Sequence, residues 1–333
     1  MREKILLPFD ESKILSSPET AFPYALLKAN FGPELDAALC RRFINCYFDL
    51  NSKQEKFEIS LSDHWCENYN ITQSYSVSLS KSTFQSLKID FTEFFKKSLQ
   101  GNNYIYGKSE LSFLPDQIPH VLGPFHYFIT GYDDLNGVFY VRLFDSNHQY
   151  YAVKVPFRDT EDSLWCGSKD IVSFQLWTVD KSVEIPLKMS NIARELEDYV
   201  LSKNSKWQYS KDKSFGMQAI ADLNAYLYQR AKENMLLEIY YLRALADHKY
   251  FMKERIFYLA EKGEISDEWI PYANDVYVLA EPLVMLGEQY NQTKGIAIAE
   301  KIHEYIERFM EMEKSYLPQV LEQIVWHWDE VRE

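Results

Sequence analysis

The 333-residue sequence predicts an α+β fold in two halves. Up to about residue 185, short runs of β-branched and aromatic residues alternate with Asn, Asp, Gly, Ser and Pro, which is typical of strands joined by turns. From about residue 190, apolar residues recur every three to four positions, as in amphipathic helices. We therefore expect an α+β domain over 1–185 and an all-helical domain over 190–333, through which copies of the chain could associate.

Seven runs in the first half have the composition of strands and predict a mixed or antiparallel sheet. Each is short, rich in β-branched or aromatic residues, and bounded by turn-forming residues. They are KFEISL (56–61), YSVSL (75–79), NYIYG (103–107), HYFITGY (126–132), GVFYVRLF (137–144), YYAVKV (150–155) and SFQLWTV (173–179).

Two helices are expected among these strands. In PELDAALCRRFINCYF (33–48), Pro33 can occupy the first helical position, and apolar or aromatic residues recur every four positions from Leu35 to Tyr47. The segment DFTEFFKKSLQG (90–101) carries more complete signals. Asp90 can serve as the N-cap, Glu93 follows three residues later, and Gly101 can end the helix.

Five helical patterns fill the second half, and two of them contain a proline at which a kink or break is expected, Pro282 and Pro318. In the last pattern, one stripe is apolar except for Glu313, while Glu and Lys occupy the other faces, so the stripe requires a helical partner. The patterns cover 190–204, 214–234, 236–263, 267–290 and 294–331. The stripe comprises Ile302, Ile306, Phe309, Glu313, Tyr316, Val320, Ile324 and Trp328.

Composition excludes several classes of function. With 36 Lys and Arg against 49 Asp and Glu, the formal charge of -13 repels nucleic acid and anionic membrane surfaces. The longest apolar stretch, VYVLAEPLVML, contains Glu281 and Pro282 and cannot span a bilayer. The first residues lack the apolar core of a signal peptide, and four irregularly spaced cysteines suggest no disulfide framework, so a reducing cytoplasm is expected. No nucleotide-binding motif is present, and we expect neither a cofactor nor a metal.

The segment HYFITGYDDLNGVFYVRLFDSN (126–147) predicts a β-hairpin with a histidine at its start and an aspartate at its end. Asp134, Asn136 and Gly137 suit the turn between the two strands. His126 opens the first strand and Asp145 closes the second. The two side chains are candidates for one site if they face each other across a groove.

Two stretches together carry a resemblance to a known family. HYFITGYDDLNGVFYV resembles the histidine, strand and Gly-Tyr-Asp core of the butirosin biosynthesis protein H N-terminal domain family, a papain-like group associated with nonribosomal peptide and polyketide gene clusters. YYLRALADHKYFMKERIFYLAEKG resembles the charged helix, with its His-Lys dipeptide and Met-x-x-Arg-Ile, that follows this domain in cluster-associated members. The order of segments also fits, so the resemblance covers roughly residues 85–330.

The resemblance implies a papain-like fold with a Cys-His-Asp site. In such a site, imidazole removes the thiol proton, the thiolate attacks a carbonyl carbon, and the acid holds the imidazole in the required tautomer. His126 and Asp145 match the base and the orienting acid, while Cys40 or Cys46 would be the nucleophile. Tyr132, Asp133 and His120 are implied substrate-binding residues. The implied activity is acyl or peptidyl transfer, or hydrolysis, on a carrier-bound thioester of bacterial natural-product biosynthesis, with an acyl- or peptidyl-carrier protein as partner.

Each candidate also has a purely structural interpretation. His126 could be a strand-end histidine bonded to a backbone carbonyl, and Asp145 could cap the hairpin corner. Cys40 and Cys46 fall within a helical pattern, where cysteine is usually a small core residue. Cys66 lies near strand signals and Cys166 comes late in the chain. His64 and Cys66 with Cys40 and Cys46 fit no zinc spacing.

Two functions therefore remain open. The first is a cysteine-dependent transferase or hydrolase. The second is a catalytically inactive relative that serves the assembly line as a binding or scaffolding protein. Outside this site, His248 and Lys249 lie mid-helix, where a solvated or interhelical charge network is expected.

Overall fold

The computed structural model describes residues 3–11, 14, 16–40, 42–49, 56–59, 72–109, 125–144, 150–160, 171–183, 187–205 and 213–330. The chain forms two compact units. The first combines Met1–Gly32 with Trp65–Val183, and the second combines Pro33–His64 with Glu184–Glu333. The segment 33–64, which the sequence places with the strands of the first half, therefore packs with the helical half.

The first unit is built on a seven-stranded sheet whose neighbouring strands are all antiparallel. The strand order is β4-β9-β5-β6-β7-β8, and β1 pairs with the end of β6 that β5 leaves unpaired. Six of these strands were predicted from composition, whereas β1, at three residues, is too short to give a signal. The strands are β1 (Lys4–Leu6), β4 (Thr72–Ser80), β5 (Tyr104–Ser109), β6 (Phe125–Asp133), β7 (Val138–Phe144), β8 (Tyr150–Pro156) and β9 (Ile171–Val179).

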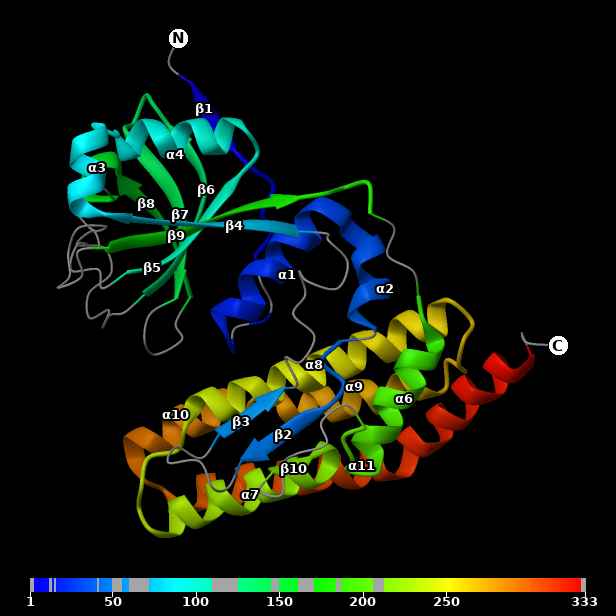
Figure 1. Cartoon of the computed structure of the whole chain (residues 1–333). Helices are drawn as coiled ribbons and strands as arrows, with labels where there is room; N and C mark the ends of the chain where they lie inside the picture. Colours follow the sequence, from blue (N-terminus) through cyan, green and yellow to red (C-terminus); the bar gives the residue numbers. More distant parts are fainter. Residues whose placement is uncertain are drawn as a thin grey trace. The chain divides into compact units, whose positions relative to one another are not determined.

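Two helices, α1 (Pro18–Phe31) and α4 (Phe91–Gln100), cover opposite faces of this sheet (Figure 1). From α1, Phe22 packs on Phe128 with ring centroids 5.2 Å apart. From α4, Phe95 packs edge-on against Phe174 at 5.3 Å. Phe128 pairs with Tyr106, and Phe174 pairs with the next residue of β5, Gly107. Because successive residues of a strand face opposite sides of a sheet, Phe128 and Phe174 lie on opposite faces. The core therefore has two layers, one on each side of the sheet.

The helix signals around α4 are confirmed. Asp90 Oδ1 accepts a hydrogen bond from the Glu93 backbone N–H at 3.0 Å, and the helix ends at Gln100, directly before Gly101. The buried side chains Phe91, Phe95 and Leu99 form its core-facing stripe. By contrast, α1 and the short α3 (Lys81–Leu87) were not predicted, because α1 contains Pro18 and Pro23 and α3 gives little apolar periodicity.

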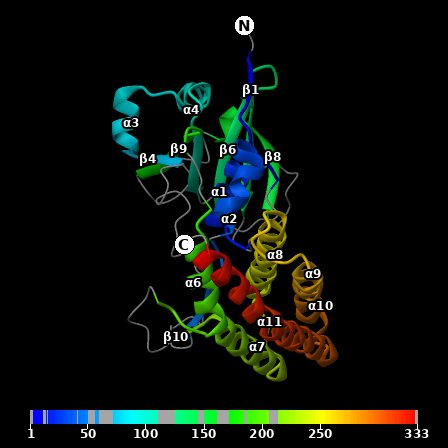
Figure 2. The same ribbon diagram turned by 90° about the vertical axis from the view of Figure 1, so that its right-hand side faces the viewer.

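The second unit is not all-helical, which corrects the expectation from sequence. It contains a three-stranded antiparallel sheet in the order β10-β2-β3, with β2 (Cys46–Asp49), β3 (Lys56–Ile59) and β10 (Lys213–Phe215). Its described helices are α2 (Leu35–Leu39), α6 (Met189–Val200), α7 (Gly216–Lys232), α8 (Ile239–Glu261), α9 (Trp269–Ala280), α10 (Leu283–Thr293) and α11 (Ile296–Glu330). A 3-10 turn at Gly32–Glu34 spans the point in the sequence where the first unit ends and the second begins. The long helix α11 packs against α6, α7, α9 and α10 (Figure 2).

The predicted helix over 33–48 is wrong beyond Leu39. After the short α2, the chain turns and enters strand β2 at Cys46. Phe43 has a positive φ of 56°, a backbone conformation that breaks any helix at this residue, and its ring stacks on Phe251 at 4.5 Å. Tertiary packing on α8 therefore overrides the four-residue apolar periodicity.

The two prolines behave differently. Pro282 separates α9 from α10, as expected, whereas Pro318 lies inside the continuous helix α11. Within the described residues, no helix combines the length and the apolarity that crossing a bilayer would require.

Candidate functional site

His126 lies on β6, directly opposite Phe144 of β7 and Lys108 of β5. It is half-buried, and its Nδ1 lies 2.8 Å from Tyr106 Oη, with which it shares a hydrogen bond. Tyr106 is a diagonal neighbour of His126 on the same sheet face, and the two rings are 6.0 Å apart. One ring nitrogen of the predicted base is thus bonded to a phenol.

A row of polar and aromatic side chains continues across the same sheet face from Tyr106. Tyr106 pairs with Gln175 of β9, and its ring lies 5.5 Å from that of Trp177, whose Nε1 donates to Gln175 Oε1 at 2.8 Å. Further along, the hydroxyls of Ser78 and Ser173 are 2.9 Å apart. We call this row the His126 face, and it comprises Ser78, Tyr106, His126, Ser173, Gln175 and Trp177.

The six residues of the His126 face are uncharged and remain accessible, and the exposed Lys108 adjoins them as the cross-strand neighbour of His126. Ser78 and Ser173 are exposed, whereas His126, Tyr106 and Trp177 are half-buried. From α1, Phe22 contacts Tyr106 edge-on at 6.0 Å and so positions the phenol beside the imidazole. This arrangement offers neutral hydrogen-bonding groups and aromatic rings to a ligand.

Several predicted residues lie outside the described residues. These are Asp145 and His120 of the implied site, and His64, Cys66 and Cys166 among the alternatives. The pairing of His126 with Asp145 stays a prediction.

Tyr132 and Asp133, implied as substrate-binding residues, have structural partners within the first unit. The buried Tyr132 donates its hydroxyl hydrogen to Glu3 Oε2 at 3.0 Å and accepts one from Gln100 Nε2 at 2.9 Å. The carboxylate of Asp133 accepts hydrogen bonds from the backbone N–H groups of Leu135 and Asn136, which closes the β6–β7 turn. Asn136 Nδ2 also donates to Asp133 Oδ2 at 2.8 Å, and this side-chain bond contributes most to the lowered pKa of Asp133, with the two backbone bonds adding to it.

Cys40 and Cys46 belong to the second unit, whereas His126 belongs to the first. Cys40 follows α2 and Cys46 opens β2, so neither lies at a helix N-terminus, where the helix dipole would stabilise a thiolate. Both side chains are buried, and desolvation raises the pKa of each thiol to about 12. The Cys46 thiol donates to the backbone oxygen of Gly216 at 3.4 Å. Both groups therefore stay protonated at neutral pH.

The His-Lys dipeptide of the resemblance forms the centre of a buried polar cluster in the second unit. Lys249 Nζ lies 2.8 and 2.7 Å from the two carboxylate oxygens of Glu313 and donates to Tyr199 Oη at 2.8 Å. Tyr199 in turn donates to Glu313 at 2.7 Å. The expected interhelical charge network is thus present, fully buried, among α6, α8 and α11.

Two further side chains of α8 bind the loop between α2 and β2. His248 Nε2 lies 2.8 Å from the backbone oxygen of Ile44. Arg255 donates from Nε to the oxygen of Cys40 at 2.8 Å and from Nη2 to that of Arg42 at 2.6 Å. The motif that supports the resemblance therefore anchors a distant segment of the same unit. The charge of Glu313 inside an apolar stripe was the sequence signal for this cluster.

Among the residues that the structure describes, no group of three or more His, Cys, Asp and Glu side chains is arranged to hold a metal ion. A comparison with models of known protein families finds no match, and neither does a comparison with curated proteins.

Proposed function

We propose that the chain is a papain-like binding or scaffolding protein of a natural-product assembly line, and that it retains the site histidine without a working Cys40 or Cys46 nucleophile. The observation that carries this proposal is the state of these two thiols. A nucleophilic cysteine needs a lowered pKa and access to substrate, whereas both thiols are buried and have raised pKa values.

The groups on the His126 face support a role in binding a ligand and not in catalysis. Its hydroxyl, amide and imidazole groups can form hydrogen bonds with an amide-rich acyl or peptidyl chain, and the rings of Tyr106 and Trp177 can pack on its apolar parts. The exposed Lys108, which pairs with His126 in the sheet, places one positive charge at this end of the face.

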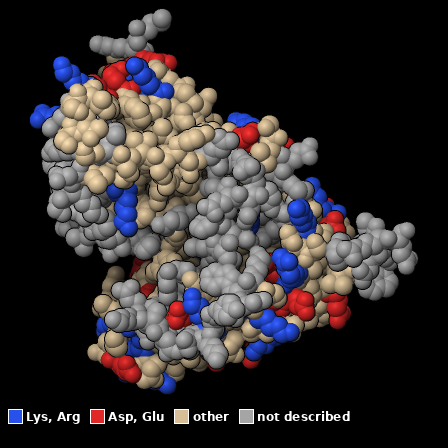
Figure 3. All heavy atoms as spheres, in the orientation of Figure 1, with Lys and Arg blue, Asp and Glu red and all other residues tan. Residues whose placement is uncertain are grey.

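The charge distribution argues for recognition of the carried group more than of the carrier surface. Acidic carrier proteins would be repelled by a chain of formal charge -13. Figure 3 shows Lys and Arg interspersed with Asp and Glu over the described surface of the face drawn, without an extended basic area. We therefore expect weak, salt-sensitive contact with the carrier itself and a larger contribution from the attached chain.

The test measures binding and turnover on one sample. An acyl-carrier protein with an acetyl or dipeptidyl group on its phosphopantetheine arm is titrated with the chain and followed by fluorescence anisotropy. Intact-mass spectrometry of the carrier then reports whether the thioester survives. We expect saturable binding, tighter for the dipeptidyl form, and an intact thioester over hours.

Variants separate the proposal from the transferase alternative. His126→Ala and Trp177→Ala should each weaken binding, whereas His303→Ala, a partly exposed histidine of the second unit, should not. Serine variants of Cys40, Cys46, Cys66 and Cys166 should leave the result unchanged. Absence of binding to either loaded carrier, or multiple-turnover thioester cleavage that one serine variant abolishes, would overturn the proposal.

A further inference from the structure

β4 is an edge strand of the first unit, and no described strand pairs with its outer side. Its nine residues pair along the inner side with β9, without interruption from Thr72 opposite Val179 to Ser80 opposite Ile171. Figure 2 shows β4 and β8 at opposite margins of the sheet. The backbone N–H and C=O groups along the outer side of β4 can therefore receive another strand.

β4 lacks the features that protect edge strands from such pairing. Natural edges are short, bulged, or equipped with lysine and proline. The opposite edge, β8, carries the exposed Lys154 and Pro156, and the other described edge strands, β1, β3 and β10, have only three or four residues. β4 contains no charged residue and no proline, and its register with β9 is regular. Of the described edges, β4 is the one open to strand addition.

The side chains of β4 are of two chemical kinds, one on each face of the sheet. Ser74, Ser76 and Ser78 are exposed on the face that carries Trp177, which pairs with Ser74. The residues between them point to the other face. There Tyr75 is 56% exposed, and Val77 is partly buried against the core. A strand that pairs with β4 must match hydroxyls on one face and apolar groups on the other.

The pairing of β4 with β9 shows which partner meets this requirement. Ser173 lies opposite Ser78, with the two hydroxyls 2.9 Å apart, and Phe174 lies opposite Val77. Hydroxyl groups thus meet hydroxyl groups and apolar groups meet apolar groups, and such cross-strand pairs are the stabilising units of a sheet. β4 has the same alternation, so a second β4 in antiparallel orientation matches it on both faces.

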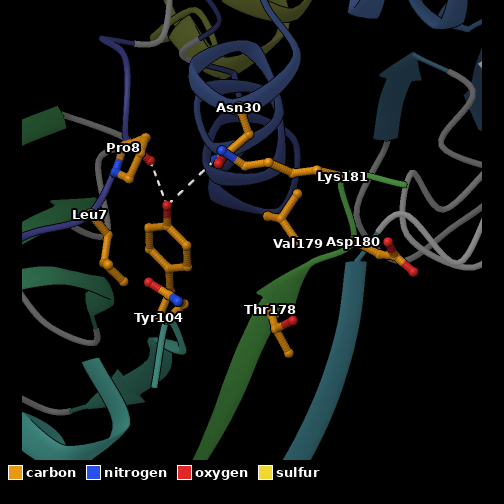
Figure 4. Close-up of a pocket in the computed structure, with 9 residues that line it drawn as sticks. Leu7, Pro8, Asn30, Tyr104, Thr178, Val179, Asp180 and Lys181 are labelled. Carbon is orange, nitrogen blue, oxygen red and sulfur yellow. Dashed lines mark hydrogen bonds between the residues drawn. The ribbon is translucent and has the colours of Figure 1, made fainter. Parts of the chain in front are cut away.

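The pocket of the first unit does not compete for this edge. It has a volume of about 560 Å³ and lies at the start of β5, where Tyr104 Oη donates to the backbone oxygen of Pro8 at 2.6 Å (Figure 4). The described residues that line it include Thr178 and Val179 of β9 but none of β4. A ligand in this pocket would leave the outer side of β4 accessible.

We propose that β4 pairs antiparallel with β4 of a second copy of the chain, which gives a dimer with two-fold symmetry. With Ser76 opposite its own counterpart, all nine residues pair, over a length of about 30 Å. In this register, Ser74 lies opposite Ser78 of the second copy, and Tyr75 lies opposite Val77. This inference does not rest on the proposed function, and it differs from the association through the helical half that the sequence led us to expect.

Sedimentation-velocity ultracentrifugation of the full chain, without any ligand, tests this assignment. We expect a monomer–dimer equilibrium at concentrations between about 1 and 100 μM, since a single strand pair makes a small interface. Higher salt concentration should favour the dimer, because salt screens the repulsion between two copies of formal charge -13. A chain that stays monomeric throughout this range would overturn the proposal.

Charges placed at the two-fold axis test the position of the interface. Ser76→Lys brings two ammonium groups together and Ser76→Glu two carboxylates, so each variant should raise the dissociation constant of the dimer about tenfold or more. An equimolar mixture of the two variants should associate again, because lysine then lies opposite glutamate. Ser315→Lys, which introduces the same charge at an exposed serine of α11, is the matched control and should dimerise like the wild type.

Circular dichroism verifies that each variant is folded. A dimer that both Ser76 variants leave intact would lie at another surface, such as the helical half, and would overturn the proposal. Folded Ser76 variants that fail to associate when mixed, or a Ser315→Lys variant that dissociates as readily as Ser76→Lys, would overturn it as well.

Discussion

Lys249 of α8 and Glu313 of α11 form an ion pair with 2.7 Å between Nζ and Oε2, and neither side chain is exposed to solvent. Two charges buried in this way are favourable only when each finds a counter-charge and further hydrogen bonds, since both have lost their hydration. Tyr199 supplies the additional bonds to both partners. The pair therefore specifies how α8 and α11 meet, because a shift of either helix would leave a buried charge unpaired.

Removal of one member of this pair should be more damaging than removal of both. We expect Lys249→Met and Glu313→Leu each to lower the free energy of unfolding by about 3–5 kcal/mol, because each leaves an uncompensated buried charge. The double variant should recover most of this loss. Urea denaturation followed by circular dichroism measures all three. The exposed pair Arg308 and Glu304 is the control, and Arg308→Ala should cost less than about 1 kcal/mol.

Arg255 should be hard to replace even by another cation. Its guanidinium donates to the backbone oxygens of both Cys40 and Arg42, a fork that a single ammonium group does not reproduce. We expect Arg255→Lys to lower the free energy of unfolding by about 1–3 kcal/mol, because at least one buried carbonyl loses its partner. If Arg255→Lys has the stability of the wild type in urea denaturation, the loop is held by other contacts.

His248 should make the second unit acid-sensitive. Burial, followed by the neighbouring charge of Lys249, holds its pKa well below 6.5, so the folded state excludes a proton that the unfolded state takes up. Stability is therefore fully present above about pH 6.5 and falls as the pH decreases below that value, by up to about 1.4 kcal/mol per pH unit. In His248→Gln this part of the slope should disappear. Urea midpoints between pH 8 and 5 measure it, and equal slopes in both proteins would refute the prediction.

Cys40 and Cys46 should react very slowly with iodoacetamide in the folded chain. With a thiol pKa of about 12, only on the order of 10⁻⁴ of either group is ionised at pH 8. Peptide mass spectrometry should show that both become modified only as fast as the second unit opens, and rapidly in urea. Fast modification of Cys46 in native buffer would contradict the burial of its thiol, which donates to the backbone oxygen of Gly216.

The cap of α4 offers a smaller and local test. Asp90→Ala removes the acceptor for the Glu93 N–H and should lower the free energy of unfolding by about 0.5–2 kcal/mol. Asp90→Asn keeps a side-chain oxygen at this position and should cost less. Thermal denaturation of the three proteins provides the comparison, and equal losses for alanine and asparagine would show that charge, not the hydrogen bond, is responsible.

Much of the first unit could be predicted because its strands carry their own local signals. The runs that became β5, β6 and β7 are apolar, β-branched and bounded by turn residues, and Asp90 with Gly101 marks both ends of α4. The missed helix α1 shows the limit of such signals. Its two prolines argue against a helix, and it forms because Phe22 and its neighbours pack on the sheet, a long-range effect absent from any local window.

The candidate site could be predicted only in part, for a similar reason. The position of His126 at the start of a strand follows from the hairpin pattern, but its bond to Tyr106 depends on the pairing register of β5 and β6. Cys46 was predicted within a helix because the spacing from Leu35 to Tyr47 imitates one. The environment that keeps its thiol protonated comes from residues 170 positions away in the sequence.

The route of the chain between the two units has a practical consequence. Because residues 33–64 leave the first unit and the chain returns to it at residue 65, no single cut separates the two units. A fragment beginning near residue 184 would lack the oxygens of Cys40, Arg42 and Ile44 to which Arg255 and His248 bind, and it would lack two of the three strands of its sheet. During synthesis, the loop that contains Ile44 leaves the ribosome about 200 residues before His248 of α8. The two can therefore bind only after a delay of some ten seconds or more.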